Sequence, residues 1–161
     1  MRLGFIELLL PTRDDHTGEA VASDVHRGAG HVEQCVHPEN QERAADLWRE
    51  LGLTFAEIPL EDEGLRVLLD WSAGIEIISP TAQEGTETAR FRAFLDEHGE
   101  GVCSVVVRTD EVEGPIAALA QHGATVRYQQ HREDGDTVLD EADLTPVFGM
   151  PVTLLATTMP D

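Results

Sequence analysis

The chain has 161 residues, which is enough for one domain that buries most of a central core. Asp and Glu number 31 against 11 Lys and Arg, and the resulting net charge of -20 repels nucleic-acid phosphates and anionic membrane surfaces. Two cysteines are too few for a disulfide framework, and the apolar run at residues 3–10 is too short to span a bilayer. We therefore expect a cytoplasmic protein without disulfides that binds neither nucleic acid nor membrane.

The first segment of the chain repeats a later one. Residues 6–12 match residues 75–81 in residue type at six of seven positions. Such self-similarity indicates a chain that is built from repeated supersecondary units. Residues 1–28 are accordingly interpreted as an extension that resembles the last strand of a further module, followed by a linker with a short helix. One interpretation pairs this strand with an exposed sheet edge, within the chain or across a dimer.

The first module, residues 29–81, is predicted to contain a strand, a helix and three strands. Alternating residue character indicates a strand at 31–36, and a 3.6-residue period indicates a helix at 40–51. Four apolar residues are predicted to form the buried stripe of this helix: Ala44, Leu47, Trp48 and Leu51. The three strands that follow are predicted at 53–58, 65–69 and 75–79.

The same order then begins again. A linking helix is predicted at 89–98, and the second module occupies residues 100–158. Its elements are a strand at 102–108, a helix at 110–122 and strands near Val126, near Val138 and at 152–156. The pattern predicts an α+β protein with two tandem βαβββ modules.

Four segments stand at characteristic points of this order: Gly30-His31-Val32, residues 74–80, residues 91–101 and residues 149–152. Over residues 29–157 the chain resembles the vicinal oxygen chelate superfamily, which includes glyoxalases, bleomycin-resistance proteins and extradiol dioxygenases. It is most similar to the branch of the methylmalonyl-CoA epimerases. The resemblance implies a glyoxalase-like, curved open barrel whose concave face holds metal and substrate. It also implies a homodimer, and pairing of the modules within one chain or between two chains stays open.

The resemblance implies four metal ligands, one from the first and one from the last strand of each module. His31 and Glu76 fill the first two positions. Imidazole and carboxylate ligands suit Zn, Fe, Ni, Co or Mn. The second module offers residues 102–105 and Thr153 at the other two positions, where the family often has histidine and a carboxylate. The set is incomplete, so a site with one divalent ion and a site without metal both stay open.

Two substitutes for the missing ligands remain as alternatives. Cys103 supplies a soft third ligand if the register of its strand places it in the cavity. Glu7, in the copied segment, replaces the carboxylate that is missing at Thr153. The simpler alternative is that the N-terminal strand only packs against the body of the domain.

Strand alternation brings Glu33 and Cys35 to the same face as His31. Under a functional interpretation, repulsion between Glu33 and Glu76 raises the pKa of one carboxyl and creates a base for proton abstraction next to a carbonyl. The alternative is that a one-residue shift turns Glu33 outward, or that Glu33 hydrogen-bonds His31.

Two functions follow, and both require a small-molecule partner. The first is a binding protein of the glyoxalase and bleomycin-resistance type without a complete metal site, whose ligand contacts are Cys35, Phe55, Trp71 and Cys103. The second is an isomerase or lyase that removes a proton next to a carbonyl, with a role in specialised metabolism. Its catalytic residues would be Glu33, Glu76, Ser104 and Thr153, the last two donating hydrogen bonds to an oxyanion.

Overall fold

The computed structural model describes residues 30–60, 63–85 and 87–158. The N-terminal extension, with Glu7, lies outside the described residues. The first module comprises β1 (Val32–Cys35), the short 3-10 helix η1 (Pro38–Asn40), α1 (Gln41–Glu50), β2 (Ala56–Leu60), β3 (Leu65–Asp70) and β4 (Ile75–Pro80). After α2 (Thr88–His98), the second module comprises β5 (Gly101–Arg108), α3 (Glu113–Ala120), β6 (Val126–Asp134), β7 (Thr137–Val147) and β8 (Met150–Thr157). The predicted order of elements is confirmed in both modules.

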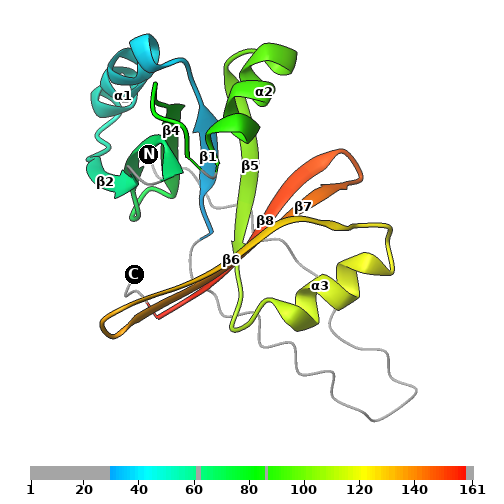
Figure 1. Cartoon of the computed structure of the whole chain (residues 1–161). Helices are drawn as coiled ribbons and strands as arrows, with labels where there is room; N and C mark the ends of the chain where they lie inside the picture. The colour runs from blue at the N-terminus through cyan, green and yellow to red at the C-terminus, as the bar shows by residue number, and fades with distance from the viewer. Residues whose placement is uncertain (1–29, 61–62, 86, 159–161) are drawn as a thin grey trace.

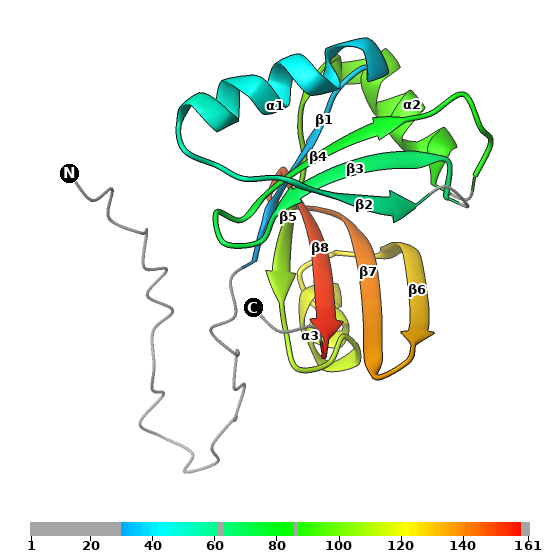
Figure 2. The ribbon, with the colours of Figure 1, turned by 90° about the vertical axis from the view of Figure 1, so that its left-hand side faces the viewer.

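The strands form one eight-stranded mixed sheet in the order β2-β3-β4-β1-β5-β8-β7-β6. In each module the first strand pairs in parallel with the last, β1 with β4 and β5 with β8. The modules join within one chain, because β1 and β5 pair antiparallel at the centre of the sheet. Figures 1 and 2 show the sheet curling so that its two halves form the walls of a half-barrel. The predicted glyoxalase-like fold class is confirmed.

Two predicted boundaries differ from the structure because side chains bind the backbone there. The first residues of the predicted strand 53–58 are a loop, in which Thr54 N donates a hydrogen bond to the Asp70 carboxylate at 2.6 Å. Helix α3 starts at Glu113 after the N-cap Val112, and the carboxylate of the preceding residue Glu111 accepts a hydrogen bond from Gly114 N at 2.9 Å in the first turn. Both corrections follow from acidic side chains that occupy amide donors.

Helix α1 covers the convex face of the first module (Figure 2). The predicted apolar stripe is wrong in part, since Leu47 and Leu51 are 61% and 69% exposed. The buried positions of this helix are Gln41 and Ala45. The Gln41 side-chain amide donates to the backbone carbonyls of Arg66 at 2.8 Å and Ile77 at 3.0 Å. These two bonds to β3 and β4 fix the rotation of α1 and leave the two leucines in solvent.

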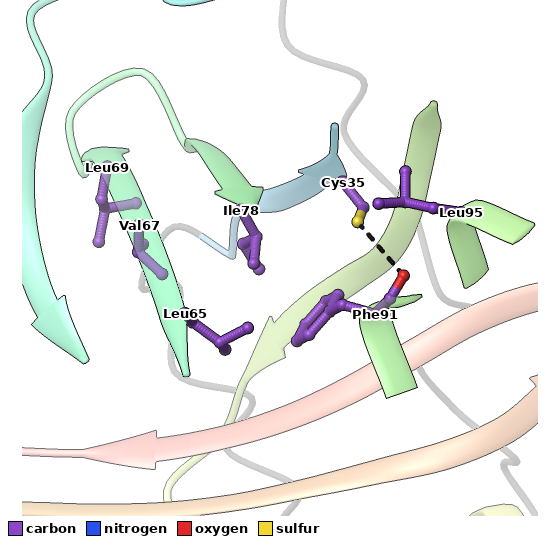
Figure 3. Close-up of a cluster of buried hydrophobic side chains, with 7 residues drawn as sticks. All are labelled: Cys35, Leu65, Val67, Leu69, Ile78, Phe91 and Leu95. Atoms are coloured by element: carbon purple, nitrogen blue, oxygen red, sulfur yellow. Dashed lines mark hydrogen bonds between the residues drawn. The ribbon is translucent and has the colours of Figure 1, made fainter. Parts of the chain in front are cut away.

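The two faces of the sheet carry different helices. Helix α3 packs on the outer face of the second module through a cluster that includes Val112, Leu144 and Leu154. Helix α2 lies on the opposite, concave face, where Phe91 and Leu95 pack against side chains of β1, β3 and β4 (Figure 3). The linking helix therefore closes one end of the hollow between the modules.

Candidate functional site

Side chains from both modules line one cavity of about 160 Å³. The first module and α2 supply a mostly apolar wall made of Ile58, Leu60, Leu65, Val67, Leu69, Trp71, Ile78 and Phe91. The second module supplies Gln130, Arg132, Leu139, Glu141 and Leu155. An apolar cavity of about 150 Å³ accepts benzene in other proteins, so this volume suits a body of about one six-membered ring.

His31 and Glu76 meet at this cavity. His31 directly precedes β1, and Glu76 is the second residue of the parallel strand β4. The His31 Nε2 atom lies 2.7 Å from Glu76 Oε2, and the side chains are 6% and 13% exposed. The His31 ring also makes an edge contact with Trp71, with ring centroids 5.4 Å apart. The predicted convergence of His31 and Glu76 on one hollow is present.

Glu33 lines the same cavity, 5% exposed, as strand alternation predicts. Burial raises the pKa of the Glu33 carboxyl well above its ordinary value, and the neighbouring charge of Glu76 raises this pKa further. Its environment includes Cys103, whose Sγ lies 3.4 Å from the Glu33 backbone oxygen and 3.9 Å from Oε2. Glu33 is therefore a buried acid that favours its protonated form.

Together, His31, Glu33 and Glu76 could hold a metal ion, because one ligand atom from each lies within 4.8 Å of the others. One imidazole and two carboxylates are an acceptable ligand set for Zn, Fe, Co, Ni or Mn. The buried His31 Nδ1 atom has no hydrogen-bond partner among the described residues. The donor set of the first module thus fits a divalent cation, with Glu33 as a third ligand that the family resemblance does not supply.

Ser104 and Thr153 occupy corresponding places on β5 and β8 and share a hydrogen bond of 2.7 Å between their hydroxyls. Each side chain is 1% exposed, and neither is among the residues that line the cavity. Ser104 pairs with Glu33 across the β1–β5 strand pair, next to the position where the register of this pair shifts. The two hydroxyls lie behind the cavity wall and satisfy each other.

Of the four residues expected to contact a ligand, Trp71 lines the cavity and the other three do not. Cys35 is fully buried in the core beside α2, where its thiol donates to the Phe91 carbonyl at 3.9 Å (Figure 3). Burial raises the pKa of the Cys35 thiol to about 12. Phe55 packs in the convex cluster near α1, because the loop before β2 carries it to that face. Both cysteines are free, in agreement with the expectation of no disulfide.

Cys103 is placed behind Glu33 rather than in the cavity. Burial raises the pKa of the Cys103 thiol, and the charge of Glu33 raises it further. A thiol that resists ionisation is a poor metal ligand, since metals bind the thiolate. The proposed substitution of Cys103 for the third ligand is therefore weakened by its electrostatic environment.

Sequence reasoning missed an arginine on α2 that organises the second wall. Arg90 pairs with Glu87 at 2.7 Å and with Asp143 of β7 at 3.0 Å, and the Asp143 side chain is completely buried. Arg127 of β6 contacts the other Asp143 oxygen at 2.8 Å. The helical period of residues 87–91 places Glu87, Arg90 and Phe91 on one face, which is the signal that could have found this residue.

Another missed residue is Glu141 of β7, which faces the cavity from the second module. Its Oε2 atom accepts a hydrogen bond from Gln130 Nε2 at 2.7 Å, and burial raises its pKa. Nearby, Arg132 of β6 bonds the carboxylate of Glu63 in the first module. Alternation along β7 places Leu139, Glu141 and Asp143 on one face, so the strand pattern alone carries this signal.

Several solved structures are similar to this fold, although no protein-family model and no curated protein match the sequence. Methylmalonyl-CoA epimerase from Mycobacterium tuberculosis aligns with a TM-score of 0.61 and 20% identity, over 84% of this chain and 91% of that one. A variant of Streptomyces coelicolor methylmalonyl-CoA epimerase, in complex with 2-nitronate-propionyl-CoA, aligns with a TM-score of 0.58 and 20% identity. The alignment covers 80% of this chain and 96% of that one. The chain has the fold of the methylmalonyl-CoA epimerases.

A hypothetical protein from Bacillus halodurans shares this epimerase fold as well, with a TM-score of 0.62 and 16% identity over 81% of this chain and 94% of that one. Identities of 14–20% among these structures show a common fold. The structural similarity to epimerases that the sequence motifs predict is thereby confirmed. No helix in the described part of the chain reaches the length and apolar character of a membrane span.

Proposed function

We propose that the protein is an isomerase or lyase that binds a small carbonyl compound in the cavity and transfers a proton at the carbon next to the carbonyl. The observation that carries this proposal is the convergence of His31, Glu33 and Glu76 on one cavity that both modules line. Buried ionisable groups with perturbed pKa values are concentrated at catalytic sites, because proton transfer needs an acid or base whose pKa is near the working pH.

Glu33 is the proposed acid and base. Its raised pKa makes its conjugate base stronger than that of an exposed glutamate. Glu76 has two functions in this proposal. Its charge raises the Glu33 pKa, and its Oε2 accepts the hydrogen bond from His31 Nε2, which holds the imidazole ring in place.

The comparison with known folds supports this class of reaction. One of the similar structures is methylmalonyl-CoA epimerase in complex with methylmalonyl-CoA and NH4+, with a TM-score of 0.58 and 19% identity. Epimerisation at a carbon next to a carbonyl requires the loss and return of a proton at that carbon. Because this chain carries a net charge of -20, we propose a substrate smaller and less anionic than a CoA thioester.

The proposal allows two forms of the site, one with a bound divalent metal and one without it. His31, Glu33 and Glu76 would hold it, and a bound ion would supply Lewis-acid polarisation of the substrate carbonyl. In the metal-bound form Glu33 is a ligand, whereas in the metal-free form it is an acid or base. A measurement of metal content therefore decides which role Glu33 has.

Ligand binding without chemistry is the second candidate function. It is favoured by the Ser104 and Thr153 hydroxyls, which replace the third and fourth family ligands and bond to each other behind the wall. A cavity with one apolar wall and a few polar groups is typical of small-molecule binding sites. In this alternative the protein retains its ligand unchanged.

Deuterium incorporation from D2O separates the two candidates. Methylmalonyl-CoA and 2-methylcyclohexanone are suitable probes, because both carry exchangeable hydrogen next to a carbonyl. We expect the protein to accelerate exchange of a probe and Glu33→Gln to slow it by about 100-fold. Glu97→Gln, at a 76% exposed position of α2, is the matched control and should exchange normally.

Equal exchange rates for the wild type and Glu33→Gln would contradict the proposed role of this residue. Saturable retention of a probe by equilibrium dialysis, with no exchange above the protein-free rate, would favour the binding protein instead.

A further inference from the structure

The charges that line the cavity do not balance. Five carboxylates face it: Glu33, Glu63, Glu76, Glu87 and Glu141. Arg132 pairs with Glu63, Arg90 pairs with Glu87 and Asp143, and Glu76 accepts a hydrogen bond from His31. Within the described ranges, Glu33 and Glu141 have no cationic partner in an ion pair. The cavity therefore presents two carboxyl groups without an ion-pair partner, one from each module.

A second, independent observation concerns His31, which lines the cavity and is only 6% exposed. Its Nε2 atom is bonded to the Glu76 carboxylate, so that nitrogen carries a proton. In the neutral ring Nδ1 then holds a lone pair, and this buried atom has no donor among the described residues. Beside a bound cation the Glu33 and Glu141 carboxyl groups would ionise, because an opposite charge lowers their pKa values, and they would then accept hydrogen bonds as His31 Nδ1 does. A ligand that satisfies them must supply N–H or O–H donors, and a positive charge suits two carboxyl groups.

One wall of the cavity is apolar. Six aliphatic side chains of β2, β3 and β4 form one wall, together with Trp71 and Phe91: Ile58, Leu60, Leu65, Val67, Leu69 and Ile78. The volume of about 160 Å³ holds a body of about one six-membered ring. An aromatic and aliphatic wall of this kind binds the apolar part of a ligand, and the face of an aromatic ring also attracts a cation.

We infer that the cavity binds an organic cation, a protonated amine on an apolar body of about one ring, with its ammonium group directed toward Glu33 and Glu141. The inference rests on the proposed function only in taking this cavity as the binding site, and it narrows the substrate class to carbonyl compounds that carry a protonated amine. The net charge of -20 also attracts cations at long range. The ammonium supplies N–H donors and a positive charge for carboxyl groups that have no ion-pair partner among the described residues.

Three probes with the same ring and different charge test this inference: benzylamine, benzyl alcohol and benzoate. Their dissociation constants are measured by titration calorimetry at neutral pH, with EDTA present so that metal ions do not compete. We expect benzylamine to bind at least about tenfold more tightly than benzyl alcohol, a difference of about 1.4 kcal/mol. Benzoate should bind more weakly than both, and added salt should weaken benzylamine binding.

Glu141→Gln is the decisive variant, because glutamine keeps the shape and the hydrogen bond from Gln130 while it removes the charge. We expect it to remove most of the preference for benzylamine over benzyl alcohol, and an unchanged circular-dichroism spectrum shows that the variant is folded. Glu97→Gln removes an exposed charge outside the cavity and should keep the preference.

The inference is overturned if benzyl alcohol or benzoate binds as tightly as benzylamine, if Glu141→Gln keeps the full preference, or if none of the three probes binds. Each of these outcomes leaves the deuterium-exchange assay to decide the proposed function separately. Exchange of a neutral ketone that depends on Glu33, combined with no preference for benzylamine, would retain the enzyme and reject the amine.

Discussion

The hydroxyls of Ser104 and Thr153 lie 2.7 Å apart and connect β5 to β8 at the places where the family resemblance expects the third and fourth metal ligands. Each hydroxyl is buried, and each provides the partner that the other needs. The second module therefore has a neutral hydrogen bond at these two places, and the three residues that could hold a metal ion come from the first module.

The hydrogen bond between Ser104 and Thr153 should contribute measurably to the free energy of unfolding. Ser104→Ala and Thr153→Val should each lower the free energy of unfolding by about 1 to 2 kcal/mol, because each leaves a buried hydroxyl without a partner. The double variant should cost less than the sum of the two, with a coupling energy of about 1 kcal/mol. Urea denaturation of the four proteins measures this cycle, and strictly additive losses would contradict the direct bond.

The Arg90 ion network predicts unequal effects of two arginines on the same helix. Arg90→Met removes a cation from the completely buried Asp143 and should cost about 3 kcal/mol in unfolding free energy. Arg92→Met is the matched control, because its partner Glu84 is 79% exposed, and it should cost about 1 kcal/mol or less. Thermal or urea unfolding gives both values, and similar losses for the two variants would contradict the role given to Arg90.

The buried Glu141 carboxyl should make the free energy of unfolding depend on pH. Its folded-state pKa is raised, so the folded protein holds this proton more tightly than the unfolded chain does. Stability from this group is therefore greatest below the unfolded-state pKa of about 4.3 and declines as the pH rises through the folded-state pKa. Glu141→Gln should lack this decline and become progressively more stable relative to the wild type as the pH rises above about 4.3.

Urea unfolding at several pH values measures that difference. A stability difference that stays constant with pH, or that turns against the variant as the pH rises, would show that the Glu141 carboxyl is not destabilised by burial.

Variants of the candidate metal site should differ in their affinity for Co²⁺. If the site binds Co²⁺, His31→Ala and Glu33→Gln should each raise the dissociation constant for Co²⁺ by about tenfold or more, because each removes a ligand. Cys103→Ser should leave Co²⁺ binding unchanged, because its thiol has a raised pKa and lies behind Glu33. Titration of the protein with Co²⁺ measures the constants, and selective loss of binding in Cys103→Ser would make the thiol a ligand.

The order of secondary structure could be predicted because it depends on local patterns, such as strand alternation at β1 and the helical period of α1. Its boundaries and rotations could not, since tertiary bonds determine them. Gln41 rotates α1 through bonds to β3 and β4, and Asp70 binds the amide of Thr54 before β2. Phe55 was expected at the ligand for the same reason, because its face depends on where β2 begins.

The candidate site shows the same division. His31, Glu33 and Glu76 could be placed together from strand parity and from the order of the modules. Arg90 and Glu141 were missed, because their proximity depends on how α2 and β7 meet, about fifty residues apart in the chain. Local periodicity places each residue on one face of its own element, but it does not encode how the two elements meet.

Direct titration of the Glu33 carboxyl by carbon-13 NMR tests the central claim of a buried acid beside Glu76 in the shared cavity. In metal-free protein, we predict a Glu33 pKa well above that of an exposed glutamate, and a decrease of this pKa in Glu76→Gln, because the variant removes the neighbouring negative charge. A Glu33 carboxyl that titrates like an exposed glutamate, or that does not respond to Glu76→Gln, would contradict the account.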